Sequence, residues 1–478
     1  MKLLSIKIKN FRSIEDLSLD VDPLDDGSFT YGLIGVNEAG KSSILRALAL
    51  KEGVVAPTSK DFKDKSKDIK ILFFYQLNYA DIVLFSDLLD IKTTAPDSSL
   101  SIDDILGNVV TLSVSFSIAN PAVPVQKIIS INKNTDANAK AALLKEKLIS
   151  IILNAVHRSV LWTTEDKFLI SHPIPLDQFA AEPEQTSIPL KNCFSLAGIT
   201  DIQESISNIR GDSTEIEHLQ KILGESVTAH IKTVWPDHPI TITFLITDGA
   251  IHFHVKDADS MSKAKTADQR SDGFKLFVSF LLTISAQDTN EELSNTILLL
   301  DEPETHLHPL AQEHLLSELI KITKNDRHNF VFFATHSNYM IDKNNLSRNF
   351  RIIKSYDSTI KKQLAKQSST YASVTYNVFN IPSTDYHNEL YDRLHQKFQD
   401  EAPNHKNREF VKTFDEEYLQ RMKNLPNNWP WKQYPNSATL PTHIRNCIRH
   451  PGVESTYNDE ELRTSTDCLL AFLSSYTN

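Results

Sequence analysis

Residues 298–309 read LLLDEPETHLHP, and this stretch decides how the rest of the chain is interpreted. Its leucines are typical of the end of a buried strand, and the carboxylates of Asp301 and Glu302 follow at the strand's tip. A nucleotide hydrolase needs such a pair, because one carboxylate holds Mg²⁺ and a second polarises the attacking water. A carboxylate pair after an apolar run is a weak signal by itself, so its interpretation depends on a second motif.

That second motif lies about 260 residues upstream, where residues 35–42 read GVNEAGKS and fit G-x-x-x-x-G-K-[ST] in full. The glycines let backbone N–H groups surround phosphate oxygens, and the lysine reaches the β- and γ-phosphates. A strand pattern at 31–34 and a helical pattern at 43–50 supply the required context, so the sequence predicts an ATP or GTP site. The expected nucleotide contacts are Gly35, Asn37, Glu38, Ala39, Gly40, Lys41, Ser42 and Ser43, and the expected Mg²⁺ ligands are Ser42 and Asp301.

Length and composition limit the other possibilities. A chain of 478 residues is long enough for two or three compact units, and its net charge of −11 argues against a basic coat over the whole surface. Its three cysteines lie far apart, so neither a disulfide framework nor a zinc ribbon is predicted. No secretion signal and no apolar run of about 18 residues is present, so we expect a cytoplasmic protein without a membrane span.

Strand and helix patterns predict an α/β fold in which an insertion splits the nucleotide site. In the segment that also carries the carboxylates, the dipeptide Asp248-Gly249 predicts a type I′ turn between two strands. The expected segments are 1–95 with the phosphate loop, 96–238 as a mainly helical insertion, 239–375 with the carboxylates, and 376–478 as an all-α C-terminal region.

Four motifs together resemble the ABC-type ATPases of the SMC and OLD (overcoming lysogenisation defect) class. They are NFRS at 10–13, the phosphate loop, DEPETHLHP at 301–309 and ATHS at 334–337. The resemblance implies an ATPase head with Mg²⁺ and ATP, built from a mixed sheet with flanking helices and an antiparallel N-terminal β lobe. It also implies that Glu302 activates water, that His336 contacts the γ-phosphate and that Arg12 lies near the nucleotide.

The same resemblance implies a role for a second chain. Residues 269–274 read QRSDGF and are similar to the R-S-x-G form of the signature motif in OLD-like ATPases. Ser271 and Gly273 of one subunit would then bind the γ-phosphate held by another, so a homodimer or higher homo-oligomer is expected. An ordinary serine cap of the following helix is a compatible alternative. No segment is expected to form the TOPRIM nuclease domain of many OLD proteins.

The C-terminal region resembles a narrower group. Its segments DYHNELY at 385–391 and THIRNCIRHP at 442–451 are similar to segments in the ATPase subunit of the Septu phage-defence system and of retron-associated relatives. In those systems a separate HNH nuclease accompanies the ATPase. The residues Arg445, Asn446 and His450 also match the R-N-x-x-x-H signature of HEPN ribonucleases, in which an arginine stabilises a phosphate and a histidine moves a proton. A capped helix end is the structural alternative.

Three functions remain open. We favour an oligomeric, slowly hydrolysing ATPase subunit of a bacterial anti-phage complex, which regulates a partner nuclease. The alternatives are a HEPN-like ribonuclease toxin controlled by the ATPase head, and an SMC-like DNA-repair ATPase. The insertion lacks the long heptad repeats of coiled-coil arms, which argues against the SMC-like alternative. A basic stretch from Arg348 to Lys366 is a candidate contact for DNA or RNA, although such charge runs are usually solvated.

Overall fold

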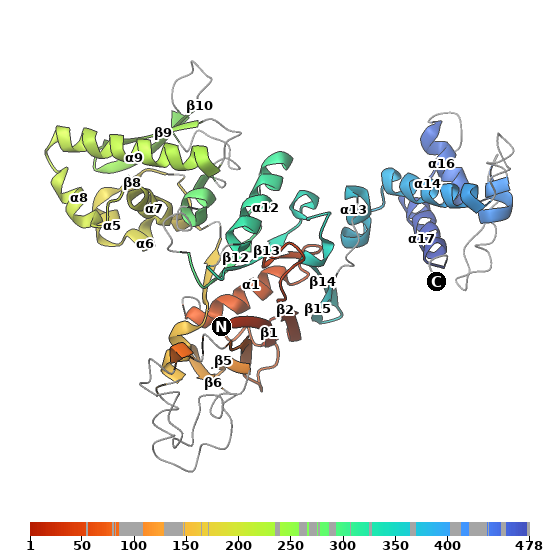
Figure 1. Cartoon of the computed structure of the whole chain (residues 1–478), viewed down its shortest axis with the longest axis horizontal. Coiled ribbons are helices and arrows are strands. Elements are labelled where there is room, and N and C mark those ends of the chain that lie inside the picture. The colour runs from red at the N-terminus through yellow and green to blue at the C-terminus, as the bar shows by residue number, and fades with distance from the viewer. Residues whose placement is uncertain are drawn as a thin grey trace, which may run out of the picture. The chain divides into compact units, whose positions relative to one another are not determined.

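The computed structural model contains two compact units, Met1–Lys366 and Gln367–Asn478. Each unit is described by itself (Figure 1). The structure describes residues 1–53, 56–78, 81, 83–85, 109–128, 147, 149–163, 165–170, 172–234, 240–257, 265–266, 275, 278–285, 293–305, 307–324, 327–363, 370–401, 413–419, 437, 439–450 and 456–475.

A mixed six-stranded sheet forms the centre of the first unit. Neighbouring strands in it run parallel, except that β15 at one edge runs antiparallel to β14. The register pairs Asp301 with Ala334 and Thr335 with Ile34, so three strands end at the same edge. The strand order is β15 (Ser358–Gln363), β14 (Asn349–Ser355), β3 (Thr30–Ile34), β13 (Phe330–Thr335), β12 (Thr296–Asp301) and β7 (Arg158–Trp162).

Both faces of this sheet are covered, which explains the uninterrupted apolar sequences of β12 and β13. Alternate side chains point to opposite faces. Ile297 and Leu299 pack in one core with α1 (Lys41–Ala49) and the N-terminal strands. Leu298 and Leu300 pack in a second core with α12 (Pro309–Lys324) and the insertion. Each such side chain contributes roughly 1.5–3 kcal/mol when fully buried.

The N-terminal β lobe is an antiparallel sheet of five strands, larger than the sequence suggested. Part of the expected insertion, residues 109–128, adds two strands to it, because Val110, Leu112, Val114 and Phe116 alternate inward along the first of them. The sheet order is β2 (Ile14–Asp20), β1 (Lys2–Phe11), β4 (Ile69–Gln76), β5 (Val109–Ser117) and β6 (Asn120–Ile128).

The remaining insertion forms a lobe that also contains strands. Strand β7 comes from the expected helical segment but joins the central sheet next to β12. The predicted hairpin is confirmed, with Asp248 at φ 52° and Gly249 at φ 74° in its turn, and it packs on α9 as part of this lobe. The other elements are β8 (Ile174–Pro175), α5 (Leu176–Ala181), α6 (Pro183–Thr186), α7 (Ile188–Leu196), α8 (Ile202–Asn208), α9 (Ser213–Val234), β9 (Ile240–Thr247), β10 (Ala250–Asp257), β11 (Lys265–Thr266) and η5 (Leu281–Ser285).

The close fit of α9 against the hairpin depends on two small residues. A Cβ atom on Gly224 would lie 3.0 Å from the carbonyl oxygen of Ile242, so the backbones approach closely there. One turn later, the Thr228 hydroxyl accepts a hydrogen bond from the Ile242 N–H at 2.9 Å. With 22 residues, α9 is the longest helix in the described part of the insertion, and no described helix there has the length of a coiled-coil arm.

The elements in the described part of the second unit are all helices, as expected. Its core is aromatic and includes Tyr391, Phe414 and Tyr418. The expected boundary at residue 376 falls inside its first helix, because α13 starts at Tyr371 and packs with the helices that follow. The described elements are α13 (Tyr371–Phe379), α14 (Thr384–Glu401), η8 (Phe414–Tyr418), α16 (Leu440–Arg449) and α17 (Asp459–Ser475).

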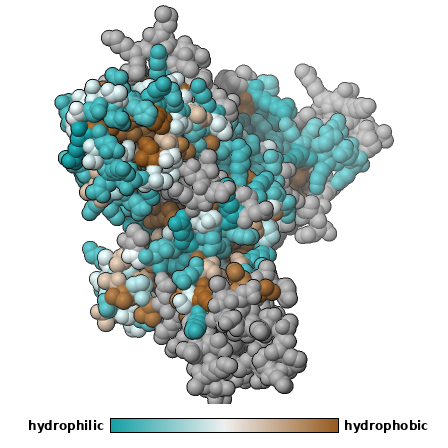
Figure 2. All heavy atoms as spheres, turned by 60° about the vertical axis from the view of Figure 1, so that its left-hand side comes forward, coloured by the Kyte–Doolittle hydropathy of each residue, from teal (hydrophilic) through white to brown (hydrophobic). Residues whose placement is uncertain are grey.

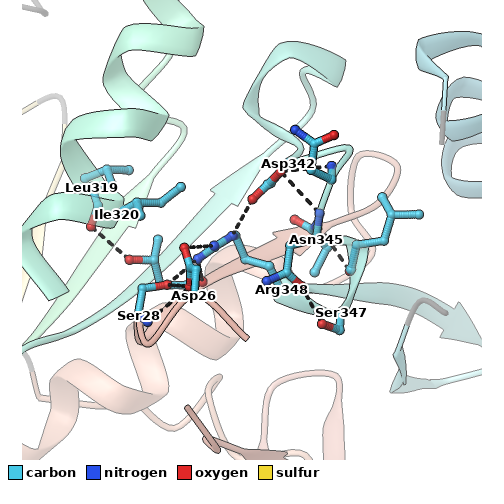
Figure 3. A network of polar contacts seen from close by, with 12 residues as sticks. Asp26, Ser28, Leu319, Ile320, Asp342, Asn345, Ser347 and Arg348 are labelled. Carbon is cyan, nitrogen blue, oxygen red and sulfur yellow. Dashed lines mark hydrogen bonds and ion pairs between the residues drawn. The ribbon is translucent and has the colours of Figure 1, made fainter. Parts of the chain in front are cut away.

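The start of the basic stretch is buried, so this part of the candidate nucleic-acid contact is wrong. Arg348 is 0% exposed and forms ion pairs with Asp26 at 2.9 Å and Asp342 at 3.2 Å (Figure 3). It also donates hydrogen bonds to the Ser28 hydroxyl and to the carbonyl of Thr30 in β3. Burial would raise the pKa of Asp26, but hydrogen bonds from Ser28 and the charge of Arg348 hold it well below its usual value. Arg348 therefore fixes the start of β3 to the segment before β14.

The described surface on the face shown in Figure 2 is mostly hydrophilic, with smaller apolar areas. Among the described residues, no helix is both long and apolar enough to cross a lipid bilayer.

Replacing Arg348 with leucine leaves Asp26 and Asp342 without their buried cation. We expect Arg348→Leu to lower the free energy of unfolding by about 3–5 kcal/mol, measured as a shift in the urea midpoint. Lys67→Met is the control, because Lys67 and its partner Asp64 are both largely exposed and such pairs contribute about 0–1 kcal/mol. Equal effects of the two substitutions would contradict the role of Arg348.

Candidate functional site

The phosphate loop lies between the end of β3 and the start of α1, in the strand–loop–helix arrangement that its sequence predicts. Gly40 precedes the helix at φ 105°, a conformation that favours glycine. A Cβ atom there would lie 2.4 Å from the Thr359 hydroxyl oxygen, so space also requires glycine. The first N–H groups of α1 face a position where a phosphate would be stabilised by the helix dipole.

Lys41 lies under this loop and is almost completely buried. Its ammonium group donates hydrogen bonds to the carbonyls of Gly35 at 2.9 Å and Val36 at 3.1 Å, and it lies 3.0 Å from Nε2 of His336. Burial lowers the pKa of Lys41 to about 8, against the opposing effect of nearby carboxylates. These contacts keep the cation at the position from which it can reach phosphates bound in the loop.

Ser42 and Asp301 lie together, as a Mg²⁺ site requires. The Ser42 hydroxyl donates a hydrogen bond of 2.9 Å to Oδ1 of Asp301, although 259 positions separate them in sequence. Burial raises the pKa of Asp301, with the Ser42 hydrogen bond opposing it. Both side chains present oxygen atoms, which Mg²⁺ prefers, so the donor set fits this ion.

Glu302 and His336 form the second pair of the site. Nε2 of His336 lies 2.7 Å from Oε1 of Glu302. Glu302 has φ 49°, and its N–H donates to the carbonyl of Ala334, so the turn after β12 is tied to the end of β13. Burial and the charge of Lys41 lower the pKa of His336, whereas Glu302 opposes this change. A neutral imidazole is therefore favoured beside the carboxylate.

Glu304, two residues after Glu302, is a site residue that the sequence motifs did not indicate. Its side chain is buried, and one of its oxygens accepts hydrogen bonds from the Thr335 hydroxyl and, at 3.3 Å, from the His336 N–H. Burial raises the pKa of Glu304 to about 7, with the hydrogen bond from Thr335 opposing this change.

A pocket of about 480 Å³ is shared by the phosphate loop, Glu302 and His336. Two of its residues, Ser13 and Lys354, come from the turn after β1 and from β14, and no sequence motif indicates a nucleotide contact for Lys354. Thr359 supports this side of the pocket, because its hydroxyl hydrogen bonds to Ser13 at 2.7 Å and to the Ala39 carbonyl at 3.2 Å. The pocket is lined by Ser13, Asn37, Glu38, Gly40, Lys41, Ser42, Ser43, Glu302, His336 and Lys354.

Three further expected nucleotide contacts are Arg12, Ser271 and Gly273. Arg12 is not among the residues that line the pocket, and its guanidinium forms a 2.6 Å ion pair with Asp61. Its neighbour Ser13 occupies the position expected for a nucleotide contact from this turn. Ser271 and Gly273, the expected signature residues, lie outside the described part of the chain.

The tail motif lies at the C-terminal end of α16 in the second unit. Arg445 is half-buried, with its guanidinium 5.7 Å from the centre of the Tyr391 ring. Asn446 donates a hydrogen bond to Ser437, and the Asn446 carbonyl accepts the N–H of His450. His450 caps the helix and is exposed. Arg445 and His450, the expected catalytic pair of a HEPN-like site, therefore differ in burial. The hydrogen bond that caps α16 is sufficient to explain the backbone conformation at His450.

Comparison with known proteins identifies the family. The family described as "AAA domain, putative AbiEii toxin, Type IV TA system" matches residues 31–342. The chain belongs to this AAA family. The match contains the phosphate loop, the carboxylates and His336, and it ends before Lys354 and Thr359.

Curated relatives of this AAA protein include two nucleases. The Old nuclease of Escherichia phage P2 is 21% identical over 76% of this chain and 61% of its own length. The OLD nuclease of Thermus scotoductus is 20% identical over 71% of this chain and 60% of its own length. The chain thus spans about three-fifths of the length of these relatives. The expected relationship to OLD-class ATPases is confirmed.

Solved structures that resemble the chain include Smc head domains. The head domain of Pyrococcus furiosus Smc, bound to the C-terminal domain of ScpA, has 12% identity and a TM-score of 0.44, with coverage of 76% of this chain and 96% of that chain. The head domain from Thermotoga maritima has 10% identity and a TM-score of 0.36, with coverage of 76% and 100%.

The raised pKa of Glu304 predicts a pH dependence of stability. Between pH about 4.5 and 7 the folded protein holds a proton that the unfolded chain has lost, so the free energy of unfolding falls as pH rises through this range. The loss from this one group is roughly 3 kcal/mol. Urea unfolding of the parent and of Glu304→Gln at pH 5, 6, 7 and 8 measures it. We expect a smaller fall in the variant, and parallel pH curves would refute the assignment.

Proposed function

We propose that this protein binds Mg·ATP and hydrolyses it at the edge where β3, β12 and β13 end. The observation that supports this most strongly is the convergence there of Lys41, the Ser42–Asp301 pair and the Glu302–His336 pair. These groups come from positions up to 295 residues apart in sequence, and their spacing suits binding and water activation in phosphoryl transfer.

In the proposed reaction, the loop N–H groups and Lys41 bind the phosphates, and the lysine exchanges its contacts with the Gly35 and Val36 carbonyls for phosphate oxygens. Ser42 and Asp301 would hold Mg²⁺, which would offset the negative charge of the phosphates. Glu302 accepts a hydrogen bond from the attacking water and takes up its proton. His336 donates the single N–H of its neutral imidazole to Glu302 and so orients this base, and its ring lines the pocket that would hold the γ-phosphate.

Glu302→Gln tests the catalytic assignment. The amide retains the shape of the side chain but cannot accept the proton, so we expect kcat for ATP to fall about 10²–10⁴-fold while Mg·ATP binding is retained. Phosphate release and equilibrium binding of a fluorescent ATP analogue measure the two effects. Glu318→Gln is a matched control outside the site, with an expected rate equal to that of the parent. Hydrolysis by Glu302→Gln at the parental rate would show that the assignment is wrong.

We further propose that two chains complete each site and that the cycle regulates a partner nuclease in a bacterial defence complex. The signature-like Ser271 and Gly273 support the first part. The second part is supported by the matched family's description, which names a toxin of a type IV toxin–antitoxin system, and by the relatives' description as OLD nucleases. The resemblance of the C-terminal region to Septu and retron-associated ATPases favours a separate HNH nuclease as the partner.

Mixing two inactive variants tests whether the site is shared. Lys41→Ala damages the phosphate loop, and Ser271→Arg blocks the signature-like segment. In a mixed dimer, one site combines the intact loop of the second variant with the intact signature of the first. We expect each variant alone to be inactive and an equimolar mixture to recover roughly a quarter of the parental rate. Full activity of Ser271→Arg alone, or no recovery on mixing, would contradict a shared site.

A further inference from the structure

The turn after β12 places two glutamates in different surroundings. Glu302 is 42% exposed and lines the pocket with His336, whereas Glu304 is 5% exposed and is not among the residues that line the pocket. The turn between them is short and ordered, because the N–H and the hydroxyl of Thr305 both donate hydrogen bonds to the Glu302 carbonyl, at 3.1 and 2.8 Å. The positions of the two carboxyl groups are therefore fixed relative to each other.

Glu304 holds the segment that carries His336. Its Oε1 accepts hydrogen bonds from the Thr335 hydroxyl and the His336 N–H. Its Oε2 is buried and has no hydrogen-bond partner among the described residues. Burying a carboxyl group with one oxygen unpaired is unfavourable, and an apolar side chain would avoid this cost. The benefit of a carboxyl group here lies in the two hydrogen bonds to Thr335 and His336.

These bonds connect the backbone and the side chain of His336 to one turn. Glu304 binds its N–H, and Glu302 contacts its imidazole at 2.7 Å. The backbone N–H of Glu302 in turn donates to the carbonyl of Ala334, two residues before His336. The relative position of the catalytic pair is thus set by three contacts between the turn and the end of β13.

The same contacts extend to α12. The Ser337 N–H donates to the Thr335 hydroxyl oxygen at 2.9 Å, and the Ser337 hydroxyl contacts the Gln312 side-chain oxygen. The Gln312 amide nitrogen donates to the Leu307 carbonyl at 2.8 Å. Leu307 follows the turn that carries both glutamates, so the network returns to the loop in which it began. The path connects residues 304, 335, 337, 312 and 307.

We propose that Glu304 is a positioning residue, which fixes residues 335–337 so that His336 meets Glu302 in the geometry needed for hydrolysis. This inference rests on the proposed ATPase function. It assigns no contact with nucleotide to Glu304, so the loss of its hydrogen bonds reduces turnover much more than substrate binding.

Two variants test the proposal: Glu304→Ala removes the acceptor of the Thr335–Glu304 hydrogen bond, and Thr335→Val removes its donor. Each removes the bond without changing a group that lines the pocket. We expect kcat to fall about 10-fold or more, because a misplacement of about 1 Å can cost 10²-fold, with KM for ATP within about threefold of the parent. Thr335→Ser restores the hydroxyl and should recover most of the parental kcat. Glu318→Gln serves as the control, and thermal unfolding confirms that each variant is folded.

A second readout does not depend on turnover. The imidazole resonances of His336 in selectively ¹³C-histidine-labelled protein, assigned with His336→Gln, report its contact with Glu302. In the parent background, Glu302→Gln should shift these resonances. In Glu304→Ala, the same Glu302→Gln substitution should shift them far less.

Two results would overturn the positioning role: parental kcat in both variants, or an unchanged resonance response in Glu304→Ala. If the parent and Lys41→Ala have equally low ATPase activity, the proposed function fails. The resonance response then still decides whether Glu304 positions His336.

Discussion

The aligned ends of three parallel strands are the constraint on which the candidate site depends. Asp301 pairs with Ala334, and Thr335 pairs with Ile34, so β12, β13 and β3 present their following residues at one edge. A shift of one residue in either pairing would move each side chain from one buried core to the other, where its neighbours differ. The register is stabilised because both faces of the strands are buried, by α1 and the N-terminal lobe on one side and by α12 and the insertion on the other.

Burial also determines the electrostatics of this edge. Lys41, Asp301, Glu304 and His336 all have pKa values displaced toward their neutral forms, and burial is the largest cause in each case. Charges of both signs lie close together and partly offset one another, so the site tolerates several ionisable groups within a small volume. Phosphates and Mg²⁺ would change this balance by adding charge of each sign. Binding is therefore expected to alter the protonation of the groups beside it.

Local motifs allowed the phosphate loop and the carboxylates to be predicted from sequence, because each motif encodes its own backbone geometry or chemistry, and the family resemblance indicated His336. The contacts of Glu304, Lys354 and Thr359 were not predictable in this way, since they join segments that only the folded sheet brings together. The role of Arg348 was missed for the same reason, because its partners Asp26 and Asp342 are not recognisable from a run of basic residues.

The pairing of β7 with β12 makes residues 163–295 one connection between neighbouring parallel strands. The chain leaves the sheet after Trp162, which pairs with Leu300, and returns at Thr296, which pairs with Arg158. The geometry of the sheet constrains such a crossover connection only in the positions of its two ends and in its handedness. The part of it that precedes the signature-like residues 269–274 can therefore differ in length and fold between related chains without altering the order of the strands. The lobe is therefore a place where related chains can acquire different recognition elements while the nucleotide edge is inherited unchanged.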